Sequence, residues 1–157
     1  MNNSPNIEIK EATHDDYEAM KQLGMQCYDS NIDPNRNYRL VRFLFLRYFS
    51  KRKFKQRQQY GVMIGVAYQA KQLVGFYELE KSGLLSSLYI LPEGQGKGYG
   101  KALLSEAIKQ AQIWHLTTMK LDASEYAKDF YLHHGFVQSG KKRQVLGITM
   151  IPMHKKL

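Results

Sequence analysis

Residues 88 to 104 are LYILPEGQGKGYGKALL, and this stretch decides the fold. It begins as an apolar strand that Pro92 ends, continues as a loop with four glycines in seven residues, and finishes in an amphipathic helix. Glycines allow backbone N–H groups to converge, and the N-terminus of a helix adds partial positive charge. The stretch therefore predicts a phosphate-binding loop at the start of a helix.

Two nucleotide-binding motifs do not fit this loop. A P-loop that ends in Gly100-Lys101 needs its first glycine at the position of Gln95 and a hydroxyl at the position of Ala102. A dinucleotide-binding G-x-G-x-x-G motif fails in both frames, because its third glycine falls on Tyr99 or on Lys101. Neither a nucleoside triphosphate nor NAD is therefore expected.

A third motif does fit, because residues 95 to 100 match the pattern Q/R-x-x-G-x-G/A. With the strand before it and the helix after it, the loop resembles the acyl-CoA signature of the GNAT N-acetyltransferase superfamily. The resemblance implies that the pyrophosphate of acetyl-CoA lies on this loop, with lysine side chains adding charge. The cofactor-binding residues that it implies are Tyr89, Ile90, Gln95, Gly96, Lys97, Gly98, Tyr99, Gly100 and Lys101.

The order of predicted elements extends the resemblance over essentially the whole chain. The patterns predict strands at 7–12, 61–69, 73–80, 84–91, 119–123, 136–139 and 145–153, and helices at 15–28, within 38–57, from about 98 onward and at 124–134. A break is expected at 33–35, and a polar turn at 140–143. The prediction is one α+β domain over residues 1–157, a GNAT-like mixed, mostly antiparallel sheet of about seven strands with helices on both faces.

The family pattern N-x-x-A-x-x-L/F-Y-x-x-x-G-F matches the segment after the fifth strand. Ala127, Phe130 and Tyr131 fall at its spacings, but Ser124 stands where asparagine is usual. The resemblance implies that Ser124 contacts the pantetheine arm and that Tyr131 is the general acid for the CoA thiolate. A serine can cap the helix and donate one hydrogen bond, although it lacks the paired donor and acceptor of an amide.

A primary amine must lose a proton as it attacks the thioester, so a base is needed. Glu78 is the predicted base and Glu80 the second candidate, because in a strand both share a face with Val74 and Phe76, where partial burial would raise the pKa of a carboxyl group. A backbone N–H of residues 88–91 would polarise the carbonyl. Because no Ser/His or Cys/His pair suggests an acyl-enzyme, we expect direct attack in a ternary complex.

Positive charge is concentrated in one segment. The chain holds 23 Lys and Arg against 14 Asp and Glu, yet residues 34–60 hold nine basic residues and no acid, so the rest of the chain balances. The resemblance implies that this segment borders the acceptor cleft, so an acidic or phosphorylated acceptor and an acidic protein surface are both open as partners. A solvated basic face, a homodimer interface, an interfacial helix and nucleic-acid binding are alternatives for the same residues.

Other features narrow the function classes. No secretory signal and no apolar run long enough to span a membrane are visible, and the single Cys27 is expected to be a small buried residue. No metal-ligand spacing is present, since His133 and His134 are adjacent and the other histidines are isolated. We therefore expect a cytoplasmic N-acetyltransferase without a metal. The alternatives are a non-catalytic acyl-CoA-binding regulatory module and, less favoured, a nucleic-acid-associated protein.

Overall fold

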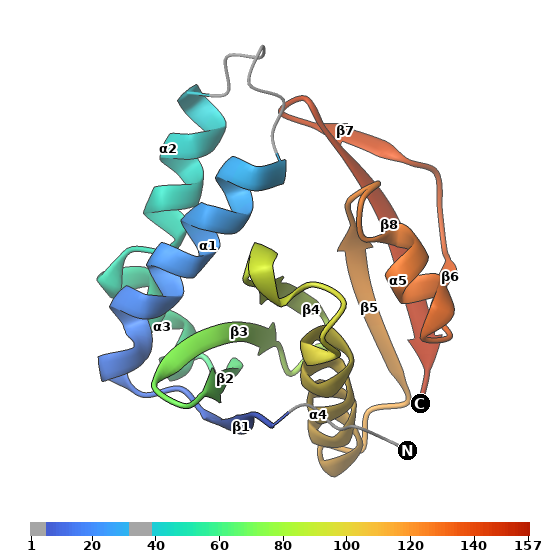
Figure 1. Ribbon diagram of the computed structural model, residues 1–157. Helices are drawn as coiled ribbons and strands as arrows, with labels where there is room; N and C mark the ends of the chain where they lie inside the picture. Colours follow the sequence, from blue (N-terminus) through green and yellow to red (C-terminus); the bar gives the residue numbers. More distant parts are fainter. Residues whose placement is uncertain (1–5, 32–38) are drawn as a thin grey trace.

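The computed structural model describes residues 6–31 and 39–157, which form two antiparallel sheets and five α-helices (Figure 1). The first sheet has the order β1-β2-β3-β4, with β1(Glu8–Glu11), β2(Met63–Gln69), β3(Gln72–Leu79) and β4(Leu85–Ile90). The second has the order β5-β8-β6, with β5(Thr118–Ala123), β8(Ile148–Lys156) and β6(Val137–Gln138); β7(Arg143–Val145) also pairs with β8. The α+β prediction is confirmed, with eight strands where about seven were expected.

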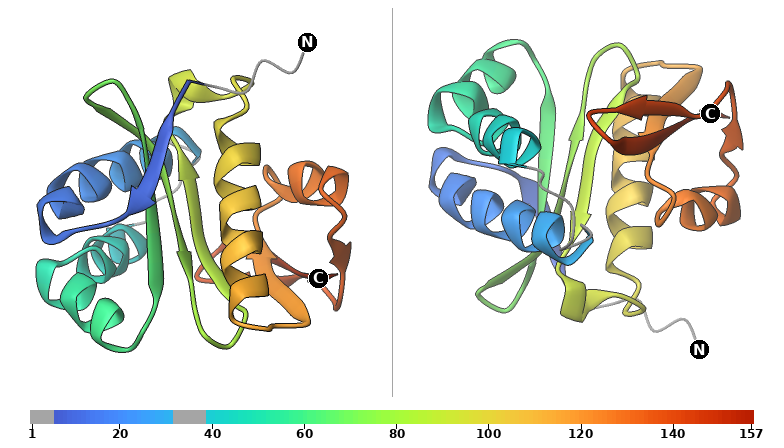
Figure 2. Two further views of the ribbon diagram at one scale, coloured as in Figure 1. Left: turned by 90° about the horizontal axis from the view of Figure 1, so that it is seen from below. Right: turned by 90° about the horizontal axis from the view of Figure 1, so that it is seen from above.

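Helices cover both faces of the first sheet, as predicted (Figure 2). One face carries α1(Tyr17–Asn31), which follows the short 3-10 helix η1(His14–Asp16), together with α2(Arg39–Tyr48) and α3(Lys51–Gln59). The other face carries α4(Tyr99–Ile113), which follows the short 3-10 helix η2(Pro92–Gly94), and α5(Lys128–His133) lies beside the second sheet. The dense run at 38–57 is therefore two helices. The expected break at 33–35 and Arg36 lie outside the described residues.

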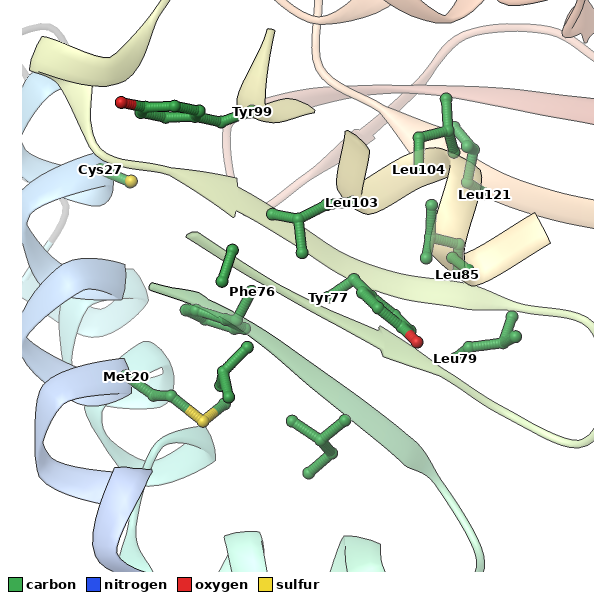
Figure 3. Close-up of a cluster of buried hydrophobic side chains, with 14 of the residues drawn as sticks. Met20, Cys27, Phe76, Tyr77, Leu79, Leu85, Tyr99, Leu103, Leu104 and Leu121 are labelled. Atoms are coloured by element: carbon green, nitrogen blue, oxygen red, sulfur yellow. The ribbon is translucent and has the colours of Figure 1, made fainter. Parts of the chain in front are cut away.

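The side chains of β3 alternate between two apolar layers. Phe76 points toward Met20 of α1, whereas Tyr77 points to the opposite face, where Leu103 of α4 packs (Figure 3). Gly75 allows α4 to approach, because a Cβ atom there would lie 2.7 Å from Leu103. Each fully buried Phe, Leu or Met contributes about 1.5 to 3 kcal/mol to folding. These two layers hold the strand and the helix that flank the glycine loop in a set geometry.

The two sheets meet at one end of β4. Leu84 forms a parallel bridge with Lys120, whose N–H donates to Gly83 O at 3.0 Å. Beyond this bridge, β4 and β5 belong to separate sheets, as their places in Figure 1 show. The edge of β4 that does not face β3 is thus left without a strand partner along most of its length among the described residues.

The C-terminal hairpin differs from the prediction. Residue 143, expected in a polar turn, begins β7, and the chain reverses instead at Leu146 and Gly147, both of which have a positive φ. The last strand runs from Ile148 to Lys156, beyond the predicted end at Met153. The turn was predicted at the wrong place because Lys141 to Arg143 are polar. The hairpin turns at Gly147 instead, because this residue, with φ of 83°, adopts the left-handed conformation that the hairpin needs. The helix expected at 124–134 is also shorter, because Ser124 to Ala127 form a turn.

Candidate active site

The glycine loop leads directly into α4. Gly98 is the N-cap residue with φ of 81°, and Gly96 has φ of 77°, so both adopt the left-handed conformation that glycine tolerates best. A Cβ atom at Gly96 would meet nothing within 4 Å, which leaves this side of the loop open. Lys97 and Lys101 are exposed beside it. The loop thus presents N–H groups and two cations on an accessible surface, an arrangement that suits a pyrophosphate.

Two side chains of the loop have partners in the protein. The Tyr126 hydroxyl donates to Gln95 Oε1 at 2.5 Å and so ties the loop to the segment after β5. Tyr99 was predicted to bind the cofactor, but its side chain is only 3% exposed, and its hydroxyl donates to Gln69 at 2.8 Å. The ring fills the space beside Gly94, where a Cβ atom would lie 2.7 Å from it. Only the backbone of Tyr99, at the start of the helix, therefore remains available to a cofactor.

The unpaired edge of β4 follows from the hydrogen-bond register. Leu91 N–H donates to Val74 O at 3.0 Å, and Tyr89 pairs with Phe76 two positions away. Because hydrogen-bonded pairs alternate in an antiparallel ladder, the N–H groups of Leu88 and Ile90 point away from β3. Ile90 therefore presents its backbone at this edge, whereas the Tyr89 N–H faces β3.

The side chain of Tyr89 lies in an aromatic cluster with Phe45, Phe49 and Phe76. The Ile90 carbonyl accepts a hydrogen bond from Cys27 Sγ at 3.1 Å. Cys27 is 5% exposed, and burial raises the pKa of its thiol to about 11, so the expectation of a small buried residue is confirmed.

The segment after β5 positions Ser124 and Tyr131. Ser124 Oγ accepts from the Ala127 N–H at 3.2 Å, so it caps the turn before α5 rather than the helix itself, whose N-cap is Ala127, and that bond leaves its hydroxyl proton available to donate. Tyr131 is 7% exposed, and burial alone raises the pKa of its phenol well above the ordinary value. No described residue forms a hydrogen bond with this hydroxyl. Tyr131 is therefore a neutral donor at physiological pH.

Glu78 is fully buried, whereas partial burial was expected. Its Oε1 accepts from Arg57 Nη2 at 3.0 Å, and its Oε2 accepts from the Tyr48 hydroxyl at 2.5 Å and from Ser87 Oγ at 3.3 Å. Glu78 shares the face of Phe76 as predicted, and this face is covered by α1, α2 and α3 (Figure 2). An amine therefore cannot reach the carboxylate without passing one of these partners. Glu80, the second candidate base, lies beyond the end of β3 and accepts from Ser82 Oγ.

Tyr89 links the two predicted catalytic residues. The pKa of Tyr89 is raised chiefly by burial and then by Tyr48, Cys27, Glu78 and Tyr131, all of which lie close enough to act on it electrostatically. Tyr131, the predicted general acid, and the buried carboxylate of Glu78 therefore both lie near Tyr89.

Three members of the Glu78 network were not predicted to be functional. Arg57 was counted only as part of the basic segment, and Tyr48 and Ser87 carried no motif. Arg57 also stacks on the Tyr48 ring, with its guanidinium carbon 4.2 Å from the ring centre. The run of basic and aromatic residues at 34–60 includes Arg57 and Tyr48, but a run of that kind does not identify a partner, and no sequence pattern pointed to Ser87. Arg42 of the same segment likewise pairs with Asp29 at 3.0 Å, so part of the apparent surface charge is paired.

A groove of about 660 Å³ lies next to this network. Its walls come from α2, α3 and the turn between β3 and β4, and they include the side chains of Tyr48 and Arg57. Within the described ranges no group of three His, Cys, Asp or Glu residues could hold a metal ion, and no helix there is long and apolar enough to cross a membrane.

Comparison with known proteins places this geometry in a family. A family model described as "Acetyltransferase (GNAT) domain" matches residues 32–157. The chain belongs to the GNAT acetyltransferase family. GNAT acetyltransferases take the acyl group from acetyl-CoA, which is the cosubstrate that the glycine loop suits.

Solved structures share the GNAT fold over nearly the whole chain. The PaiA N-acetyltransferase from Thermoplasma acidophilum, solved with coenzyme A, is 24% identical with a TM-score of 0.81, covering 97% of this chain and 99% of that one. A GCN5-related N-acetyltransferase from Rhodopseudomonas palustris is 19% identical with a TM-score of 0.83, covering 98% and 96%. The putative acetyltransferase YncA from Salmonella typhimurium, solved with acetyl-CoA, is 21% identical with a TM-score of 0.69, covering 96% and 93%.

Proposed function

We propose that residues 1–157 are one cytoplasmic N-acetyltransferase domain, which transfers the acetyl group of acetyl-CoA to a primary amine by direct attack in a ternary complex. The observation that carries the proposal is the continuity of the unpaired β4 edge with the open glycine loop at the start of α4. This arrangement offers backbone donors to the pantetheine arm and to the pyrophosphate of an acyl-CoA molecule.

The loop and the strand edge would divide the cosubstrate between them. The N–H groups of Gly96, Gly98, Tyr99 and Gly100 would bind the pyrophosphate together with the side chains of Lys97 and Lys101, since the Lys97 N–H itself donates to Gly94 O. The unpaired edge at Ile90 would bind the pantetheine arm. Ser124 would donate its hydroxyl proton to the same arm. Gln95 would position the loop through its hydrogen bond with Tyr126. The Tyr89 N–H faces β3 and is not available to the cosubstrate, so Tyr89 would act by packing its ring in the aromatic cluster and thereby positioning the strand edge.

The chemistry would need two proton transfers. The amine nitrogen attacks the thioester carbonyl, the C–N bond forms and the C–S bond breaks, and Tyr131 donates its proton to the departing thiolate. An N–H group of the β4 edge would stabilise the charge that develops on the carbonyl oxygen. A phenol with a pKa near or above 10 donates uphill to a thiolate whose conjugate acid has a pKa of about 8.5, so the site must assist this step.

The proton of the amine would travel in the other direction. Because Glu78 is fully buried, we propose that it receives this proton through Tyr48, whose hydroxyl accepts from the amine while it donates to Glu78. Acceptance of a proton weakens the ion pair with Arg57, and the hydrogen bond from Ser87 remains to hold the neutral carboxyl group.

A screen for release of the CoA thiol over a panel of primary amines tests this proposal. Acetyl-CoA with an accepted amine should release one thiol for each N-acetyl product, with no covalent acetyl-protein. Measured CoA binding without thiol release for any amine would contradict catalysis and favour the regulatory module.

A further inference from the structure

The groove between α2, α3 and the β3–β4 turn has a strong charge bias. Four cations line it, namely Arg47, Lys53, Arg57 and Lys81, against the single acid Glu80. Arg57 is neutralised by Glu78, but none of the other three forms an ion pair with a described residue. The remaining charge in the groove is therefore positive, and it favours an anionic occupant.

A second observation points the same way. Arg57 Nε is buried and has no hydrogen-bond partner among the described residues, although both Nη atoms are used, by the Tyr48 carbonyl and by Glu78. A buried donor without a partner is unfavourable, because the group has lost water and gained nothing in return. An oxyanion that reached Nε after a shift of the Arg57 side chain would supply the missing acceptor.

The size and the remaining walls of the groove restrict the occupant further. A volume of about 660 Å³ suits a small molecule rather than a helix or a folded partner. Leu44, Tyr60 and Val62 supply apolar contacts, and Tyr48 connects the groove to Glu78. An occupant whose anionic end binds the cations can therefore present its other end to Tyr48.

We propose that this groove selects the acceptor, and that the acceptor is a small primary amine that also carries a carboxylate or a phosphate group. This inference rests on the proposed transferase function. The anionic group lies among Arg47, Lys53 and Arg57, and the amine is held toward Tyr48. A polyamine, which carries only positive charge, is disfavoured by the same field.

Matched acceptor pairs test the inference through thiol release. The pairs are β-alanine with β-alaninamide and O-phosphoethanolamine with ethanolamine, with spermidine as the cationic member and rates expressed per free amine. We expect kcat/KM to be at least tenfold higher for one anionic member than for its neutral partner, and the two pairs separate carboxylate from phosphate. Equal or better use of the neutral members or of spermidine would overturn the proposal.

Two variants locate the selection in the groove. In the double variant Arg47→Gln and Lys53→Gln, the ratio of kcat/KM for the anionic member to kcat/KM for its neutral partner should fall at least tenfold. Lys55→Gln is the matched control, since Lys55 is exposed on the same helix but does not line the groove. Lys81 is left unchanged because it packs 4.0 Å from the Trp114 ring centre. A preference that survives the double substitution would overturn the proposal.

A binding measurement separates this inference from the proposed function. With CoA at saturation to occupy the glycine loop, inorganic phosphate is titrated while backbone amide shifts are followed by NMR. Shifts at residues 53–57 and 80–82 that disappear in the double variant support the groove as an anion site, and their absence in the wild type overturns it. Failure of every amine to release thiol, with CoA bound, would instead overturn the transferase function.

Discussion

Tyr48, which lines the groove, donates a hydrogen bond of 2.5 Å to Glu78, which is fully buried. Since the carboxylate is fully buried, we propose that a bound amine exchanges its proton with it through this tyrosine. The consequences of this arrangement can be measured.

Tyr48→Phe should lower kcat about 10²-fold, because a positioned proton transfer is commonly worth ~10² to 10⁴ in rate. The KM for acetyl-CoA should stay the same, since the glycine loop is untouched. Tyr77→Phe is the control: it removes the hydroxyl of a buried tyrosine on the opposite face of β3, away from Glu78. Steady-state kinetics decide, and a wild-type kcat in Tyr48→Phe would exclude the relay.

Glu78→Gln should lower the free energy of unfolding by about 3 kcal/mol, because it leaves Arg57, whose side chain is 12% exposed, without its counter-charge. Denaturant unfolding without CoA measures this loss. Glu106→Gln breaks the exposed pair with Lys109 and should change stability by less than ~1 kcal/mol. Similar losses of unfolding free energy in both variants would mean that the buried Glu78–Arg57 pair stabilises the protein no more than an exposed pair does.

Tyr131→Phe should reduce thiol release by ~10² to 10⁴ with every accepted amine, while the Kd for CoA changes little. Burial raises the pKa of the Tyr131 phenol well above its ordinary value, so the acid form is retained as the pH rises. In the wild type, kcat should accordingly show no fall from loss of this proton up to about pH 10, where a solvent-exposed tyrosine titrates. An unchanged rate in Tyr131→Phe would remove it as the general acid.

Gly98→Ala should weaken CoA binding about fivefold to tenfold, because a Cβ atom at φ of 81° is strained by ~1 to 2 kcal/mol and turns the loop N–H groups. Gly147→Ala introduces the same strain at φ of 83° in the β7–β8 turn. Both variants should lose stability, but only Gly98→Ala should lose CoA affinity by calorimetry. Equal affinity in the two would place the pyrophosphate elsewhere.

The stability of the protein should fall above pH 9. The folded-state pKa of Cys27 is raised from 9.0 to about 11, so between these values the unfolded chain binds fewer protons than the folded one and is favoured as the pH rises. Two pKa units correspond to roughly 2 to 3 kcal/mol. Cys27→Ala should flatten the slope of unfolding free energy against pH between 9 and 11. An unchanged slope would mean that the loss of stability at alkaline pH comes from other groups. Tyr68 and Tyr77 are candidates, since their pKa values are also raised, to about 12.

Much of the site could be predicted because its signals are local. Gly96, Gly98 and the apolar face of α4 lie within one contiguous stretch, and backbone conformation and helical period are properties of neighbouring residues. The inward position of the Tyr99 ring could not be predicted, since it depends on Gln69, which lies 30 residues away in the chain.

The sequence by itself determined the strand, glycine loop and helix that suit acetyl-CoA, and with them the family, because each is specified by adjacent residues. Tertiary structure alone decided the surroundings of Glu78. Glu78 meets Tyr48 across 30 positions, Arg57 across 21 and Ser87 across nine. Such contacts depend on how α2 and α3 pack on the sheet, and charge counts along the chain carry no information about that packing. The same packing turned Arg57 from one of nine basic residues in a run into the buried partner of a carboxylate.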